Sequence, residues 1–177
     1  MSNGAHTSRN EIRVRLEEEN VVCSLDGIYL ARAQQRMDNW TRIVHMAPRG
    51  KTLEVYKGVI DEAAHGSFQG KIRVWPNAIQ SDARQLNRNL LLSEHAEAAS
   101  KPELEILNDE VQCAHGSTIG DLDEESLFYL RARGVGEAAA RRLLIDAFVG
   151  EVIDKVADVP IRKYFRNLFN SWLSEAV

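Results

Sequence analysis

The stretch KIRVWPN, residues 71–77, shows the pattern that decides the fold class. Ile72 and Val74 alternate with polar side chains, and Pro76 and Asn77 then form a predicted turn. Similar short alternations, each followed by Asn, Asp or Gly, recur at 21–25, 53–55, 104–106 and 111–115. Short strands at such intervals predict a β-sandwich, a β-barrel or a β-solenoid, and the alternation alone does not choose among them.

Glycines set the expected ends of several of these strands. We expect one strand to end at Asp26-Gly27, a second at Gly58 and a third at Gly116, because glycine in a strand often marks a break. Before residue 120, residues 81–99 are the only stretch whose sequence is compatible with a helix.

The period of the apolar residues becomes helical after residue 120. Asp123 is a predicted N-cap for a helix over 124–132, and Gly134 a predicted C-terminal glycine. A second helix is expected from about Glu137 to Val156, with apolar groups over more than half its circumference. A third begins near Pro160 and repeats apolar residues at i, i+3, i+4 and i+7. The stripe of this last helix, 160–176, predicts docking onto the chain's own core or into the groove of a partner.

Three parts follow from these patterns: a disordered N-terminus over 1–8, a β core over 9–120 and a C-terminal helical domain over 121–177.

Composition agrees with a folded protein, because 44% of the 177 residues are hydrophobic and 27% are charged. The net charge of -4 argues against a nucleic-acid binder. No apolar run approaches the ~20 residues of a membrane helix, and no signal-peptide core is present. We therefore expect a cytoplasmic protein with two reduced cysteines.

One apparent nucleotide motif fails. Gly50-Lys51-Thr52 resembles the end of a phosphate-binding loop, but the position five residues before Gly50 is His45 rather than glycine. The chain is therefore not a P-loop ATPase by itself.

The segment with chemical content is Cys113-Ala114-His115. Residues i and i+2 of a strand point to the same face, ~7 Å apart, and a thiolate and an imidazole are good ligands for zinc and iron. Two ligands fill half of a tetrahedral site, so the remaining donors must come from elsewhere, most naturally from a second chain. Cys113 also continues the apolar face of Val111, where a small core residue is the commoner role.

Several segments resemble the SufB/SufD family of iron–sulfur cluster assembly proteins, and within it SufD. They cover residues 9–150 in order and include DNWTRIVHMAP (38–48), YKGVID (56–61), HGSFQG (65–70), SDARQLNRNLLLS (81–93), KPELEI (101–106), VQCAHGSTIG (111–120) and LFYLRARG (127–134). The resemblance implies a right-handed parallel β-helix followed by a small helical domain. It also implies a non-enzymatic scaffold subunit that pairs with SufB and docks the ABC-type ATPase SufC.

The resemblance implies roles for individual residues as well. His115 and Cys113 are expected to contact iron or a nascent cluster transiently at the interface with SufB, with no permanently bound cofactor. The helical region is expected to contact SufC through Leu127, Phe128, Tyr129, Leu144 and Phe148.

Other interpretations remain at this point. Family members are much longer, so we expect a C-terminal fragment or a truncated paralogue whose open end self-associates. A metal-free module that regulates an ATPase is one alternative function. A small metalloenzyme on a β-scaffold, using His115 and Cys113 with His45 or His65, is another.

Overall fold

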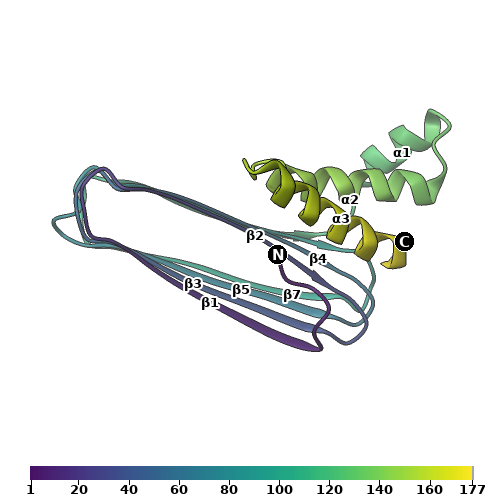
Figure 1. Cartoon of the computed structure of the whole chain (residues 1–177), viewed down its shortest axis with the longest axis horizontal. Helices are drawn as coiled ribbons and strands as arrows, with labels where there is room; N and C mark the ends of the chain where they lie inside the picture. Colours follow the sequence, from purple (N-terminus) through teal and green to yellow (C-terminus); the bar gives the residue numbers. More distant parts are fainter. Residues whose placement is uncertain (177) are drawn as a thin grey trace.

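A computed structural model describes residues 1–176 as eight β-strands followed by three α-helices (Figure 1). The strands are β1 (Thr7–Leu16), β2 (Val22–Ala31), β3 (Arg36–His45), β4 (Lys51–Ile60), β5 (His65–Val74), β6 (Asp82–Leu91), β7 (Glu97–Ile106) and β8 (Gln112–Gly120). The helices are α1 (Glu124–Ala132), α2 (Glu137–Ile153) and α3 (Val159–Ala176). Val177, the last residue of the expected helical domain, lies outside the described residues.

The strands form a parallel β-solenoid of about four coils. Odd-numbered strands pair in the order β1-β3-β5-β7, which we call the odd sheet, and even-numbered strands in the order β2-β4-β6-β8, the even sheet. Every pairing is parallel, and the partner of a residue lies about one coil further along the chain, as Thr7 pairs with Arg36 and Arg36 with His65. The two sheets face one another across the core (Figure 1). The β-solenoid, one of three architectures left open by alternation and the one implied by the resemblance, is confirmed.

The glycines expected to end strands lie inside them. β2 runs through Gly27 and β4 through Gly58, because neighbouring aromatic rings occupy the space that a side chain would take. A Cβ at Gly27 would lie 2.3 Å from the Tyr56 ring, and one at Gly58 would lie 2.4 Å from the Tyr29 ring. β8 likewise continues past Gly116 to Gly120. These glycines mark close packing rather than turns.

Residues 81–99 are not helical. They contain β6 and the start of β7, so the alternative of a helix over this stretch is wrong. The inner face of β6 is polar, which hides its period-two pattern from an analysis of apolar residues. Asn87 Nδ2 donates to the Tyr29 hydroxyl (3.2 Å), and Asn89 Nδ2 donates to Asn87 Oδ1 (2.8 Å). These hydrogen bonds satisfy amides that would otherwise be costly to bury.

The three helices lie on the side of the even sheet (Figure 1). The Asp123 side chain accepts a hydrogen bond from the Ser126 amide and caps α1, and Gly134 has a φ of +87°; both confirm the predicted ends. α2 and α3 pack on the outer face of the even sheet in one core cluster, whose buried members include Ile28, Val59, Leu90, Ile145, Val149, Phe169, Trp172 and Leu173. The apolar stripe of α3 therefore docks onto the chain's own core from Phe165 onward, whereas Ile161 and Tyr164 at its start are exposed.

The residues before β1 run beside β2. Ser2 forms a parallel bridge with Tyr29, its amide donates to Ile28 O (2.9 Å), and its carbonyl accepts from the Leu30 amide (2.9 Å). Within residues 1–176, none of the helices combines the length and the apolar content needed to cross a membrane.

Candidate functional site

The last strand of the even sheet carries the predicted donor pair. β8 pairs with β6 on one side, and among residues 1–176 no strand pairs with its other side. Cys113 is half-buried and packs against the inner core cluster that includes Ile43, Ile72 and Ala83. His115 is exposed. The pair therefore lies on the last coil, at the end of the solenoid where β7 and β8 are the outermost strands.

Register places His115 on the inner face of the solenoid. His115 is the Cα partner of Gln85, whose side chain is buried between the sheets, and it is two residues from the inward-facing Cys113. Gly116 lies on the opposite face, because a Cβ there would be 3.2 Å from Leu86 Cδ1, and Leu86 packs toward the helices. β8 does not end at Gly116 as expected, so a strand end there does not account for the exposure of His115. The ring is accessible because no described strand follows β8 in its sheet.

Cys113 is poorly placed to be a free thiolate. Burial raises the pKa of the Cys113 thiol, the nearby Asp82 carboxylate raises it further, and a hydrogen bond from the Ala83 backbone partly opposes both. A metal ion would have to displace the thiol proton. Of the two candidate ligands, His115 is therefore the more available in this chain.

The histidines considered as a third ligand do not join this pair. His45 is buried, and its Nε2 lies 2.9 Å from the Thr52 hydroxyl. Thr52 is separated from Cys113 by Ala83 in the same register row, and two strand spacings are ~10 Å. His65 starts β5 on the outer face of the odd sheet. Across residues 1–176, no group of three or more His, Cys, Asp or Glu side chains could hold a metal ion.

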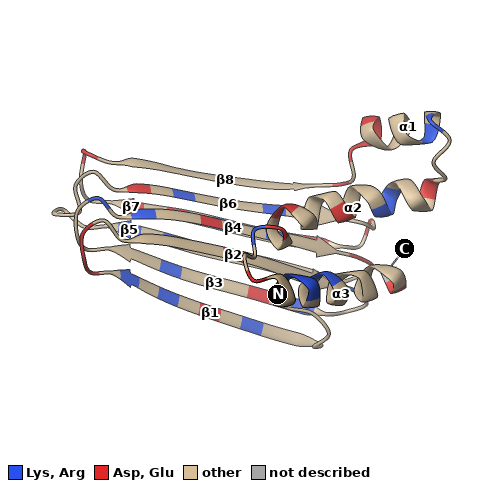
Figure 2. Ribbon diagram, turned by 45° about the horizontal axis from the view of Figure 1, so that its top comes forward, with Lys and Arg blue, Asp and Glu red and all other residues tan. Residues whose placement is uncertain are grey.

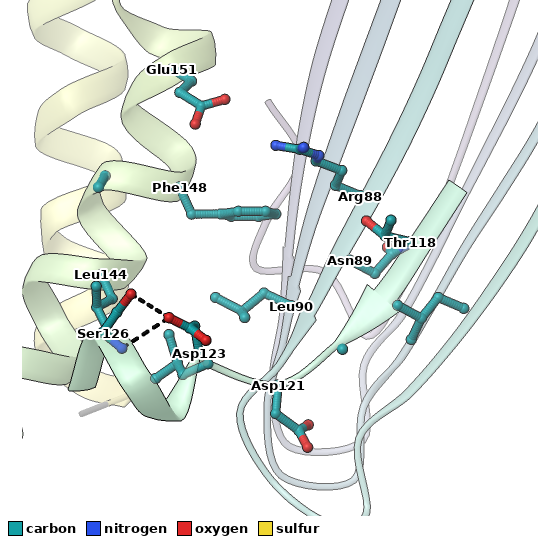
Figure 3. A pocket seen from close by; sticks show the side chains of 14 residues that line it. Arg88, Asn89, Leu90, Thr118, Asp121, Asp123, Ser126, Leu144, Phe148 and Glu151 are labelled. Atoms are coloured by element: carbon teal, nitrogen blue, oxygen red, sulfur yellow. Dashed lines mark hydrogen bonds between the residues drawn. The ribbon is translucent and has the colours of Figure 1, made fainter. Parts of the chain in front are cut away.

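A cavity of about 670 Å³ lies between the end of β8 and the helices (Figure 3). Its lining combines polar groups of β6 and β8, such as Arg88 and Thr118, with Leu144, Phe148 and Glu151 of α2. Figure 3 shows Phe148 projecting from α2 toward the strands, between Glu151 and Leu144 along the helix. The cavity thus spans the junction of the solenoid and the helices.

The five predicted partner contacts divide into two groups. Leu127 is buried, and Leu144 and Phe148 are partly buried against the core cluster. Phe128 and Tyr129 of α1 are 72% and 55% exposed. Only the two aromatic side chains of this set thus present a large apolar surface to solvent.

Two buried charged residues escaped sequence reasoning, one at this junction and one between the two sheets. Lys57 is 1% exposed, and its Nζ donates to Phe148 O (2.7 Å) and to the Glu151 carboxylate (2.5 Å) while lying over the Phe148 ring. Glu54 is fully buried between the sheets, where burial raises the pKa of its carboxyl and the hydrogen bond from Gln85 opposes that shift. Neither belongs to a recognisable motif. A charged residue at the centre of an apolar alternation, as in LEVYKGVI (53–60), was the available signal.

These observations define a class of protein: a parallel β-solenoid with a Cys-x-His pair on its last strand and helices over one sheet. Comparison with known proteins gives the family. A family model described as "SUF system FeS cluster assembly, SufBD core domain" matches residues 1–148, and the chain belongs to this family.

Relatives from several organisms agree with this assignment. An iron–sulfur cluster assembly SufBD family protein of Synechocystis is 40% identical over 86% of this chain and 34% of its own length. The chloroplastic protein ABCI7 of Arabidopsis thaliana is 36% identical over 94% of the chain and 35% of its own length. The iron–sulfur cluster assembly protein SufD of Escherichia coli is 30% identical over 90% of the chain and 38% of its own length. The chain thus spans little more than a third of each of these relatives.

Proposed function

We propose that this chain is a cytoplasmic, non-enzymatic scaffold subunit for iron–sulfur cluster assembly that resembles SufD. In this role its last coil pairs with a SufB-like subunit, and its helical region docks a SufC-like ATPase. The iron or nascent cluster is cargo that the chain contacts transiently, and His115 is the donor that this chain supplies.

The observation that carries the proposal is the exposure of His115 on the inner face of the last coil. Inward-facing positions of the preceding coils are closed by the next coil, as for Gln85, whereas His115 has no described coil above it. An imidazole and a nearby thiol provide two donors, which is half of a tetrahedral shell. A second subunit that covered this coil would both bury the ring and supply the missing donors.

The helical region supports the ATPase-docking part of the proposal. Phe128 and Tyr129 are exposed on α1, and aromatic residues are enriched in protein interfaces. The buried contact of Lys57 with α2 ties this region to β4, so movement of a docked ATPase would be transmitted to the solenoid.

The proposal predicts a specific effect of His115→Ala. In a complex reconstituted from this chain and SufB-like and SufC-like subunits, the variant should lower the yield of assembled cluster by at least about tenfold. We take tenfold as the lower bound because losing even an outer-shell partner of a metal ligand lowers metal affinity or activity by about that factor. Binding of the SufC-like subunit, measured by co-purification, should be unchanged because α1 lies away from the ring.

His95→Ala is the matched control, since His95 is also exposed but lies in the turn between β6 and β7. It should leave the cluster yield at the wild-type level. An unchanged yield with His115→Ala, together with intact binding of the SufC-like subunit, would remove the ligand role and leave the metal-free module that regulates an ATPase.

A further inference from the structure

A row of polar side chains crosses the inner face of the even sheet toward His115. Glu54, Gln85 and His115 are successive Cα partners on β4, β6 and β8. Neighbouring strands lie ~4.8 Å apart, so Gln85 stands between the other two residues. Glu54 and Gln85 are 0% and 2% exposed, whereas His115, at the end of the row, is exposed. The row therefore runs from the closed core to the open face of the last coil.

Glu54 orients the side-chain amide of Gln85. Glu54 Oε2 accepts a hydrogen bond from Gln85 Nε2 at 2.6 Å, which assigns the amide nitrogen to the side of β4. Gly70 on the odd sheet leaves room for this arrangement, because a Cβ at Gly70 would lie 2.3 Å from Gln85 Nε2. Gln85 Oε1 is buried and has no hydrogen-bond partner among residues 1–176. The hydrogen bonding along the row thus stops at Gln85, at a buried carbonyl oxygen that lacks a donor.

The imidazole of His115 is the donor that register places next to this oxygen. A neutral imidazole carries one N–H and one lone pair, and an exposed ring changes rotamer within nanoseconds. Buried polar groups in proteins are nearly always hydrogen-bonded, so an unpaired buried acceptor beside a mobile donor favours their contact.

We propose that Gln85 is a positioning residue for His115. Gln85 Oε1 accepts a hydrogen bond from one ring nitrogen of His115, which holds the ring in a single tautomer and turns the lone pair of the other nitrogen toward the open face. The inference rests on the proposed function, in which this second nitrogen contacts the nascent cluster. Histidines that bind metals usually donate their other N–H to a carboxylate or a carbonyl in this way. Here Glu54 anchors the acceptor without contacting the ring.

The tautomer of His115 can be measured directly in the full chain by long-range ¹H–¹⁵N correlation NMR. At about pH 8.5, well above the ordinary histidine pKa of about 6.5, the wild-type ring should show one tautomer. Gln85→Met keeps the side-chain length but removes both the carbonyl oxygen and the NH2 of the amide, and should give the tautomer mixture of a free imidazole. A wild-type ring that already shows this mixture overturns the inference, whether or not the variant folds.

Glu54→Gln is the matched control, because it retains a side-chain oxygen that can accept from Gln85 Nε2. This variant should keep the single tautomer of the wild type. In the reconstituted complex, Gln85→Met should lower the rate of cluster formation by about tenfold or more, the cost of losing an outer-shell partner of a metal-binding histidine.

The two proposals fail in different ways. Cluster formation that survives His115→Ala would overturn the proposed function, while a single wild-type tautomer lost in Gln85→Met would still support the positioning role. Identical tautomer mixtures in the wild type and in Gln85→Met would overturn the positioning role, even if His115→Ala abolishes cluster formation.

Discussion

The two sheets of the solenoid share one coil architecture and differ in their outer faces. The outer face of the even sheet carries apolar side chains such as Ile28, Val59 and Leu90, which join one buried cluster with α2 and α3. The outer face of the odd sheet carries charged rows, among them the register row Arg13, Arg42, Lys71 and Glu103. Figures 1 and 2 show the helices on the even side and the charged strands β1 and β3 on the other.

This difference shows that the outward residues of each strand decide where the helices dock. Parallel sheets are usually covered on both faces, which makes their strands continuously apolar. β4 follows that rule, with buried residues from Glu54 to Ile60, whereas β3 and β5 alternate between buried inward and partly exposed outward residues. The odd sheet is thus built to face water on one side.

The largest expected effect comes from removing apolar contact on the covered face. Phe169 of α3 is fully buried in the cluster beneath the helices. Phe169→Ala should lower the free energy of unfolding by about 3–5 kcal/mol, because it leaves a cavity as well as losing apolar burial. Urea denaturation followed by circular dichroism measures this change.

An aromatic residue on the outer face of the odd sheet, which none of the described helices covers, provides the comparison for Phe169. Trp75 follows β5, is 40% exposed and lies beneath the Arg73 guanidinium. Trp75→Ala should cost less than about 1 kcal/mol, the scale of an exposed cation–π contact. Equal losses in the two variants would show that the helices add no more stability than a surface contact.

A smaller effect is expected where a buried cation joins β4 to α2. Glu151→Gln should lower the free energy of unfolding by about 1 kcal/mol at pH 7, since the Glu151 side chain is largely in solvent and its attraction to Lys57 is screened. In a Lys57→Met background, the same substitution should have no effect, which a double-mutant cycle measures. An undiminished loss in that background would mean that Glu151 acts through another neighbour.

This ion pair also predicts a dependence on pH. The hydrogen bond from Lys57 holds the pKa of Glu151 below its ordinary value of 4.5. A carboxyl whose pKa is lower in the folded state contributes stability that is complete above the unfolded pKa and is lost as the pH falls through the folded pKa. The difference between the wild type and Glu151→Gln should therefore shrink as the pH is lowered below 4.5.

Much of the fold was predictable because its signals are local. Alternation located β2, β4, β5, β7 and β8 but not β1, β3 or β6. Asp123 and Gly134 located the ends of α1, and the apolar stripe of α3 located most of its buried side. Strand ends were not predictable where a glycine inside a strand makes room for an aromatic ring from an adjacent coil. Gly58, for example, makes room for the Tyr29 ring 29 positions earlier, and only the register of the coils brings the two together.

The candidate site was predictable in part for the same reason. The i, i+2 spacing placed Cys113 and His115 on one face, but the exposure of His115 follows from the position of β8 at the edge of its sheet. Gln85 and Glu54 lie 30 and 61 positions before His115, and no local pattern connects them to it. Their role follows only from hydrogen bonding across strands.

The smallest expected effect on stability comes from a Lys→Met substitution on the outer face of the odd sheet, which no helix among residues 1–176 covers. The same type of substitution at Lys57, beneath α2, provides the comparison. Lys71 Nζ lies 2.7 Å from Glu103 and 2.9 Å from Glu105, on the outer face of the odd sheet. Lys71→Met should shift the urea midpoint only at low ionic strength, and the shift should vanish in 1 M salt, where exposed charges are screened within ~3 Å. Lys57→Met should instead keep most of its shift in 1 M salt, because its ammonium group is buried beneath α2 and also donates to the Phe148 carbonyl. A salt-independent shift in Lys71→Met would mean that the outer face of the odd sheet is shielded from solvent as the even one is.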